Sequence, residues 1–180
     1  MKIYTIGHSN HPLQEFVDLL EKYHVTRLVD VRSAPYSKYV IWFNKESLEH
    51  GLSMHKIKYS YAGKLLGGRP TDPTCYRSGS VPEGEADYLH EVDYAAVMQR
   101  PWFQKGITHL LELAENEATA VMCSEENPAD CHRHHLIAKY LMAEFPEWEI
   151  QHIRGDGKLN NAASIHTSVN PQPGEQLSLF

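Results

Sequence analysis

The feature that most constrains the fold is an alternation of short, apolar, β-rich runs with longer stretches whose apolar residues recur at helical spacing. The β-rich runs lie at residues 2–7, 27–32, 58–61, 119–123 and 149–153. Helical stripes separate them, the first consisting of Leu13, Phe16, Val17 and Leu20 on one helix face. Strands that alternate with helices pair in parallel and are covered on both sides. The sequence therefore predicts a single α/β domain with a mostly parallel sheet and helices on both faces.

This pattern extends over residues 1–157, which are predicted to form the α/β domain that carries the functional site. After that point the chain is polar, contains Pro171, Pro173 and Gly174, and has no sustained period. Residues 158–180 are therefore predicted to be a flexible tail. Inside the domain, turn residues dominate from Thr71 to Glu85, which is long for a connection and predicts a functional lid or a mobile insertion.

Charge is distributed unevenly along the chain. The net charge of −6 argues against a protein that coats nucleic acid through bulk electrostatics. Residues 27–77, however, hold nine lysines and arginines against four acidic residues, whereas residues 78–130 hold two against eleven. The basic segment also contains many aromatic residues, which is typical of proteins that stack bases, although the same rings could be core and rim residues of an ordinary sheet. A surface for single-stranded or distorted DNA is predicted on this segment.

Cysteine usage and the absence of long apolar runs indicate the compartment. No run approaches the roughly 18 apolar residues that cross a bilayer, and residues 1–7 are typical of a strand rather than a signal peptide. We therefore expect a cytoplasmic protein with no membrane partner. Three cysteines cannot form a closed disulfide framework, and two of them flank a polar loop beside histidines, which favours chemistry or metal binding.

Polar and ionisable residues follow four of the predicted strands. In open parallel sheets, ligands gather at the carboxyl ends of the strands, so we expect these residues to converge on one cleft. The residues are His8 and Ser9 after the first strand, Asp30 and Arg32 at the second, Gly67, Gly68 and Arg69 beyond the third, Cys123 and Glu125 after the fourth, and Cys131, His132 and Arg133 at the start of the next helix.

The residue types suggest roles for this set. Carboxyl and imidazole groups from different strand ends can act as acids and bases. The arginines, with Ser9 and the two glycines, can bind an anion or another part of the substrate. A helix start binds phosphate or carboxylate and lowers the pKa of a nearby thiol. We therefore assign catalysis to His8, Asp30, Glu125, Cys131 and His132, and anion or substrate binding to Ser9, Arg32, Gly67, Gly68, Arg69 and Arg133.

A metal site is the competing explanation for the histidines and cysteines. Cys123, Cys131 and His135 are weak candidates, since Cys131 and His135 are four residues apart on one helical face. Seven residues separate the two cysteines, unlike the two to four of ordinary zinc knuckles, and no second ligand pair is present. The sequence specifies no cofactor.

Four short motifs in this order resemble one bacterial family. They are Thr5-Ile6-Gly7-His8-Ser9, Asp30-Val31-Arg32 with Pro35 and Ser37, Leu66-Gly67-Gly68, and Cys123-x-Glu125 leading to Cys131-His132-Arg133. Together they resemble the domain of unknown function 488 family over roughly residues 1–155. The resemblance implies that the strand-end residues form the shared site, but it implies no particular activity.

The last residues carry a separate signal. Gln176, Leu177, Ser178, Leu179 and Phe180 are similar to the peptide with which bacterial repair and replication proteins dock on the sliding clamp. Apolar anchors on an otherwise polar segment need a groove to bury them. The alternative is a terminal strand that folds back over the protein's own core.

These observations predict a clamp-recruited DNA-maintenance protein, most simply an enzyme that acts on a phosphate-bearing or nucleobase substrate at the strand-end site. Two alternatives remain open: a non-catalytic nucleic-acid-binding adaptor, and a thiol- or metal-dependent enzyme unrelated to DNA.

Overall fold

The computed structural model describes residues 1–84 and 86–165 and has the predicted α/β architecture. Six strands form one sheet in the order β3-β2-β4-β1-β5-β6, parallel except for β6, which pairs antiparallel with β5. The strands are β1 (Lys2–Gly7), β2 (Arg27–Asp30), β3 (Lys58–Tyr61), β4 (Thr119–Cys123), β5 (Glu149–Ile153) and β6 (Leu159–Asn161).

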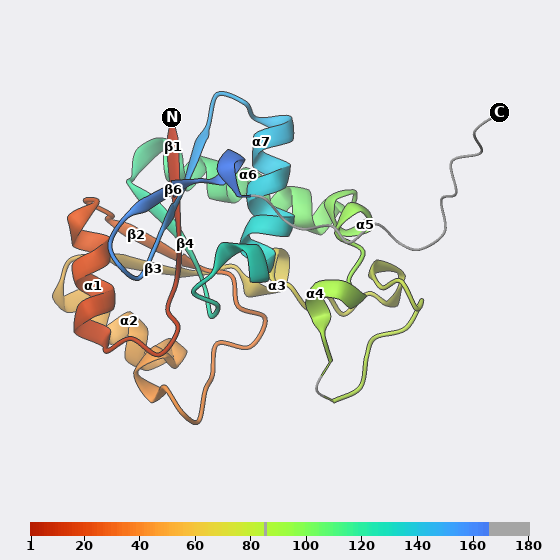
Figure 1. Ribbon diagram of the computed structural model, residues 1–180, viewed down its shortest axis with the longest axis horizontal. Helices are drawn as coiled ribbons and strands as arrows, with labels where there is room; N and C mark the ends of the chain where they lie inside the picture. Colours follow the sequence, from red (N-terminus) through yellow and green to blue (C-terminus); the bar gives the residue numbers. More distant parts are fainter. Residues whose placement is uncertain (85, 166–180) are drawn as a thin grey trace.

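The helices cover both faces of this sheet, as predicted (Figure 1). They are α1 (Leu13–Lys22), α2 (Lys45–Met54), α3 (Gly63–Leu66), α4 (Tyr88–Glu91), α5 (Tyr94–Met98), α6 (Pro101–Asn116) and α7 (Lys139–Glu144). A π-helical turn, η4 (Arg133–Ala138), leads directly into α7. Four short 3-10 turns complete the structure: η1 (Ile41–Phe43), η2 (Pro73–Cys75), η3 (Pro128–Asp130) and η5 (Ala162–Ser164).

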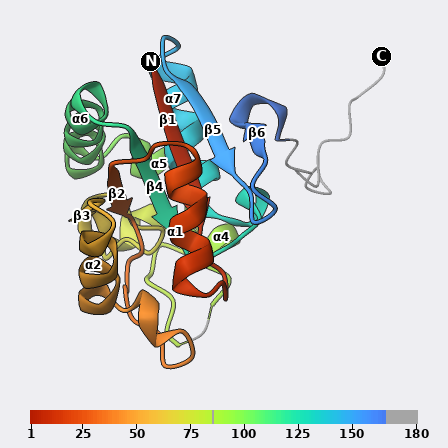
Figure 2. The ribbon, with the colours of Figure 1, turned by 90° about the vertical axis from the view of Figure 1, so that its left-hand side faces the viewer.

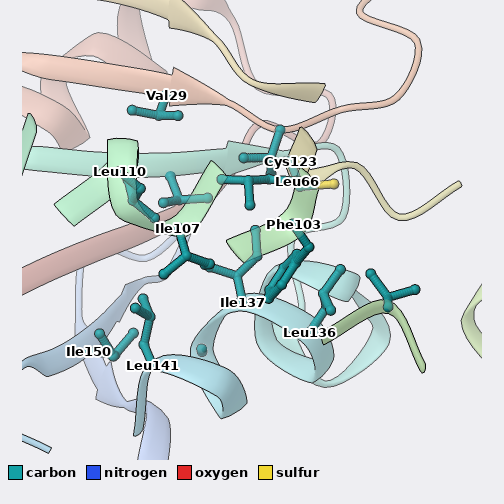
Figure 3. Packing of buried hydrophobic residues seen from close by; sticks show 14 of the residues in the cluster. Val29, Leu66, Phe103, Ile107, Leu110, Cys123, Leu136, Ile137, Leu141 and Ile150 are labelled. Atoms are coloured by element: carbon teal, nitrogen blue, oxygen red, sulfur yellow. The ribbon is translucent and has the colours of Figure 1, made fainter. Parts of the chain in front are cut away.

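Two apolar cores lie on opposite faces of the sheet because neighbouring strand residues point in opposite directions. Leu28 packs with α1 and α2, whereas Val29 packs with α6 and η4. Figure 2 shows α1 in front of the strands and α7 behind them. Figure 3 shows the second core, in which Phe103 and Ile107 of α6 lie among side chains from β2, η4 and β5. A strand buried on both faces is continuously apolar, which explains the β-rich runs of the sequence.

Two regions add detail to the sequence-based expectations. The folded domain extends beyond residue 157, because Leu159–Asn161 pairs with β5 and Ala162 is buried in the core. Its pairing uses backbone groups, so the polar side chains there gave no strand pattern. The turn-rich stretch after residue 71 is attached to the domain at Cys75 and Tyr76, which are buried, and Tyr76 forms a bridge with Val92, whereas most of its other described residues are exposed.

Among the described residues, no helix has both the length and the apolar character that spanning a bilayer requires.

Candidate functional site

A pocket of about 630 Å³ opens where the parallel strands end. Most of the residues predicted from strand ends line it, as expected for this sheet topology. These are His8, Ser9, Arg32, Gly68, Arg69, Cys123, Glu125, Cys131 and His132. Four other predicted residues, Asp30, Gly67, Arg133 and His135, do not line the pocket, and each has a structural partner instead.

Arg32 is the best-fixed charge of the pocket. Its Nε donates to Oδ1 of Asp30 at 2.9 Å, and its Nη2 donates to Oδ2 of Asp30 at 2.6 Å and to the carbonyl oxygen of Phe43 at 2.8 Å. Asp30 is fully buried, and Arg32 is 4% exposed. Asp30 therefore positions Arg32 rather than meeting a ligand, and Arg32 presents a pre-oriented guanidinium to the pocket.

His8 also serves this arrangement. Its Nδ1 lies 2.7 Å from the carbonyl oxygen of Ser9, and its Nε2 lies 3.2 Å from Nη1 of Arg32. The ring stacks on Phe43 at 4.3 Å between centroids. Burial, followed by the charge of Arg32, lowers the pKa of His8 to about 4. A neutral ring that donates through Nδ1 to Ser9 accepts through Nε2 from Arg32, so His8 orients Arg32 and has no nitrogen free for proton transfer.

Arg133 was predicted to bind an anion, but its side chain is fully buried beneath the pocket. Its Nη1 donates to the carbonyl oxygen of Glu125, its Nη2 donates to that of Glu126 at 2.6 Å, and its Nε donates to Oγ1 of Thr5 at 3.3 Å. Arg133 therefore holds the loop after β4 onto β1. The position of Arg133 at a helix start does not predict this role, because the contact forms only when the loop after β4 folds over the end of β1.

Two glycines explain how the backbone packs so closely here. A Cβ at Gly7 would lie 1.8 Å from the carbonyl oxygen of Glu125, so the loop after β4 passes directly over the end of β1. A Cβ at Gly68 would lie 2.6 Å from Cγ of His132, so the backbone of Gly68 rests against the imidazole ring. Gly67, by contrast, packs against Gly63 and Ser33 and is a packing residue.

Arg69 is the second cation of the pocket, and it is exposed. Its backbone N–H donates to Oγ of Ser33 at 3.0 Å, and its guanidinium lies 4.5 Å from the ring centroid of Tyr88. Unlike Arg32, it is held by a ring rather than by a carboxylate. It is therefore the more adaptable of the two cations.

Cys123, Cys131 and His132 form a compact cluster, which we call the Cys–His cluster. Their ligand-capable atoms all lie within 4.8 Å of one another, and all three residues are buried. Nδ1 of His132 lies 3.5 Å from Sγ of Cys123 and 3.9 Å from Sγ of Cys131. Nε2 of His132 is buried without a hydrogen-bond partner.

The two thiols of the Cys–His cluster have opposite acidities. Hydrogen bonding to Cys131, burial and the charge of Cys131 raise the pKa of Cys123 well above its ordinary value. Burial opposes ionisation of Cys131 as well, but hydrogen bonds from Cys123 and His132 and the charges of His132 and Arg133 outweigh it and lower the pKa of Cys131 well below its ordinary value. Cys131 is therefore the more acidic of the two thiols.

The other predicted metal candidate, His135, lies outside the Cys–His cluster. Its Nε2 lies 2.6 Å from the carbonyl oxygen of Ala129, and its ring stacks with Tyr94. The four-residue spacing from Cys131 is present in the backbone, where the N–H of His135 donates to the carbonyl oxygen of Cys131 at 3.2 Å, but Ala129 and Tyr94 hold the ring of His135 away from the two thiols. His132, the next residue after Cys131, supplies the ring instead.

A buried polar network behind the pocket was not singled out by sequence reasoning. Oγ1 of Thr5 lies 2.6 Å from Nδ1 of His152, whose Nε2 lies 3.1 Å from Nδ1 of His134. Burial is the largest cause that lowers the pKa of His152 to about 3 and that of His134 to about 4. Both rings are therefore neutral at pH 7. The alternation of β5 places His152 on an inward face, which was the available signal.

Tyrosines form much of the remaining pocket wall. Tyr36 and Tyr39 are exposed, and both come from the basic segment. Tyr88 and Tyr94 line the pocket from the region that follows the turn-rich stretch, and neither was predicted. The signal that could have found them is the position of that long connection, because long connections in compact domains often carry function.

The basic segment of residues 27–77 does not form one face, contrary to the expectation. Arg27 and Lys58 lie at the amino ends of β2 and β3, where both bind Glu117. Arg32 and Arg69 lie at the opposite end of the sheet, in the pocket. Successive parallel strands all start at one edge and end at the other, so a charged segment that contains two of them is divided between both edges.

The helix start at residues 131–133 also offers less to an anion than expected. The N–H of Cys131 donates to the carbonyl oxygen of Pro128, and the N–H of Arg133 points to Sγ of Cys131 at 3.5 Å. Asp130 does not bind the helix start, since its Oδ2 accepts from Asn127. The predicted clamp-binding peptide, residues 176–180, lies outside the described residues.

No curated protein and no solved structure matches this chain. A family model described as "Domain of unknown function DUF488" matches residues 12–141. That range contains Arg32, Gly68 and all three residues of the Cys–His cluster, and it covers well over half of the chain. The chain therefore belongs to the DUF488 family.

Proposed function

We propose that this protein is a DNA-maintenance enzyme that takes a nucleobase or phosphate-bearing group of single-stranded or distorted DNA into the strand-end pocket. We propose further that its terminal peptide, residues 176–180, docks it on the bacterial sliding clamp. The observation that carries the first proposal is that one pocket combines two arginines, exposed tyrosines and the Cys–His cluster.

The size of the pocket suits a single nucleotide. Its volume of about 630 Å³ lies within the usual range for small-molecule sites, about 300–1,000 Å³. Enzymes that act on a base must remove it from the base stack, and single-stranded or distorted DNA makes this removal less costly. A pocket of this size at the edge of the sheet supports such a substrate.

The lining supplies two kinds of recognition that DNA requires. Arg32 and Arg69 offer guanidinium donors for a phosphate oxygen; Asp30 holds the first, and the second packs on the ring of Tyr88. Tyr36 and Tyr39 are 61% and 78% exposed, so their ring faces are available to stack on a base. The reactive group then comes from the Cys–His cluster, which lies in the same lining.

One observation favours a second candidate, a thiol- or metal-dependent enzyme that acts on a small molecule other than DNA. Asp87, Glu125 and Asp130 also line the pocket, and all three are exposed. Such carboxylates repel a continuous phosphate backbone, whereas a small substrate with a positive or hydrogen-bonding group would tolerate them.

DNA binding tests the first proposal. We expect the full chain to bind a fluorescent single-stranded oligonucleotide, measured by anisotropy, with an affinity that falls as salt rises. Arg69→Ala and Tyr39→Ala should each weaken binding by about 5- to 30-fold, the effect of losing roughly 1–2 kcal/mol of contact. Lys58→Ala is the matched control, because Lys58 lies at the opposite end of the sheet and should leave the affinity unchanged.

Equal losses in Arg69→Ala and Lys58→Ala would contradict pocket binding. Turnover is followed by the mass of the oligonucleotide after incubation, using unmodified, mismatched and abasic strands. Binding without any mass change would favour the adaptor. No binding to any strand would favour the second candidate.

Clamp docking is tested separately with purified bacterial sliding clamp. The full chain should bind the clamp, and the double variant Leu177→Ala with Phe180→Ala should not, because these residues are the apolar anchors of the peptide. The melting temperature of the double variant should equal that of the parent chain. A double variant that binds the clamp unchanged would refute the docking role.

A further inference from the structure

The Cys–His cluster has the composition and spacing of a metal site. Zinc is bound by thiolate sulfur and imidazole nitrogen, at about 2.3 and 2.0 Å, in tetrahedral geometry. These bond lengths place a nitrogen and a sulfur ligand about 3.5 Å apart. In the cluster, Nδ1 of His132 lies 3.5 Å from one sulfur and 3.9 Å from the other. The three groups already stand close to the separation that a shared ion would impose.

The two sulfurs are also placed to share a cation. They lie within 4.8 Å of each other, and a divalent cation between them would bind both as thiolates. The N–H of Arg133, 3.5 Å from Sγ of Cys131, is a hydrogen bond of the kind that supports metal-bound thiolates.

The surroundings of His132 favour Nδ1 as the nitrogen that can coordinate a metal. Its Nε2 is buried and has no hydrogen-bond partner, so no carboxylate or carbonyl holds the ring through that atom. The backbone of Gly68 packs against the ring, and a Cβ there would lie 2.8 Å from Nδ1. Within the described part of the chain, the hydrogen-bond contacts of this buried imidazole are with the two sulfurs, so it is placed to coordinate an ion together with them.

We infer that Cys123, Cys131 and His132 bind a zinc-like divalent ion as a three-ligand site whose fourth position faces the strand-end pocket. Three protein ligands with one open position are the pattern of catalytic rather than structural zinc sites. An ion in that position polarises a carbonyl or phosphoryl oxygen, or activates a bound water. This inference deepens the proposed function by naming the reactive group, but the ion can be detected without DNA.

Cobalt is the probe for this site. The full chain is reduced, freed of metal with a chelator and titrated with Co²⁺ alone. We expect one equivalent to bind, with thiolate-to-cobalt charge-transfer absorption and the visible bands of tetrahedral cobalt, and Zn²⁺ should displace it. Cys123→Ser, Cys131→Ser and His132→Gln should each lower the cobalt affinity by about 100-fold or more, beyond the loss typical of outer-shell changes.

The controls are two residues of the same types outside the cluster. Cys75→Ser and His135→Gln should bind cobalt as the parent chain does, since Cys75 lies in the apolar core and His135 bonds to Ala129. If the cluster variants do not fold, the parent chain still decides the question. Zinc should then slow alkylation of Cys123 and Cys131 and leave that of Cys75 unchanged, as mapped by mass spectrometry.

Three outcomes would overturn the inference. The first is a fully reduced chain without thiolate-to-cobalt absorption. The second is absorption that persists in Cys123→Ser, or that is lost in Cys75→Ser. The third is a chain that forms a disulfide between Cys123 and Cys131 but binds neither cobalt nor zinc when reduced. Because no DNA is present, cobalt binding can succeed while the oligonucleotide test fails, so the two proposals are judged independently.

Discussion

The two ends of the parallel sheet both carry charged residues, but they use them differently. At the amino end, Arg27 donates to both carboxylate oxygens of Glu117, at 2.8 and 3.0 Å, and Lys58 donates to the same carboxylate at 2.9 Å. At the carboxyl end, Arg32 is bound by Asp30 and still lines a pocket. The polar groups at the first end satisfy one another, whereas those at the second are arranged around an open space.

The cost of burial makes this difference informative. The amino-end groups are partly exposed, so water would solvate them even without their partners. At the carboxyl end, by contrast, Asp30, Arg32 and His132 are almost fully buried, and Nε2 of His132 has no hydrogen-bond partner among the described residues. Burying polar groups costs free energy of desolvation. We therefore expect the functional site at the end of the sheet where polar groups are buried.

The largest expected effect is the loss of Arg133. Arg133→Ala should destabilise the fold by about 3–5 kcal/mol, because it removes a fully buried side chain and leaves the carbonyl groups of Glu125 and Glu126 and the hydroxyl of Thr5 without their donor. Urea denaturation measures the change. Arg154→Ala is the matched control, since Arg154 also binds this loop through Glu126 but is 25% exposed and should cost below about 1 kcal/mol. Equal costs would show that burial does not distinguish this end of the sheet.

Next in size is the effect of a methyl group against His132. Gly68→Ala places a Cβ 2.6 Å from Cγ of that ring, so the ring must move. We expect about 10- to 100-fold weaker cobalt binding, as for other changes that displace a ligand, with a stability cost of about 1–3 kcal/mol. Gly51→Ala is the control, because its Cβ would meet only the flexible end of Leu13, at 2.6 Å. If the cobalt affinity of Gly68→Ala were unchanged, His132 would not be a ligand of the metal.

The same contrast explains what could be predicted from the sequence. Strand positions and strand ends follow from local apolar periodicity, so His8, Arg32 and Cys131 could be placed at the carboxyl edge without coordinates. That reasoning depends on chain order alone. It also places Arg27 at the opposite edge, so the predicted parallel sheet already divides the basic segment between both edges, contrary to the single face predicted from charge alone.

Other features depend on contacts between segments distant in sequence, and these were not predictable. Arg133 looks like a helix-start anion ligand until the loop at Glu125 folds over Gly7 and captures it. The strand β6 forms through backbone pairing with β5, without any apolar pattern. His135 follows Cys131 at helical spacing, but its ring is held by the carbonyl oxygen of Ala129, and His132 joins the two cysteines instead.

Acid should affect the carboxyl-end network more strongly than exposed histidines. The folded-state pKa of His152, about 3, lies below its ordinary value of 6.5, so the unfolded chain binds the extra proton first. Its contribution to stability is therefore complete above pH 6.5 and is lost as the pH falls toward 3. The melting temperature should drop over that window. The drop should be smaller in His152→Gln, whereas His109→Gln, at an exposed position, should behave as the parent chain does.

The smallest effect on stability is expected at the amino end of the sheet, where Glu117 binds Arg27 and Lys58. Glu117→Gln weakens two ion pairs, but the carboxylate is 20% exposed and Lys58 is 64% exposed, so the loss should stay near about 1 kcal/mol in urea denaturation. Hydrogen bonds from Arg27 and Lys58 lower the pKa of Glu117 to about 2 from 4.5. Its stabilisation is therefore present above pH 4.5 and is lost as the pH falls toward 2.

This acid loss lies below most of the window of His152, so the two ends of the sheet can be told apart in one pH series. Glu117→Gln should also leave oligonucleotide and cobalt binding unchanged, because Glu117 binds residues at the edge of the sheet away from the pocket. If Glu117→Gln weakened either ligand as much as Gly68→Ala does, the amino end would belong to the functional site. The distinction between an amino end whose charged groups bind one another and a carboxyl end that binds ligands would then be wrong.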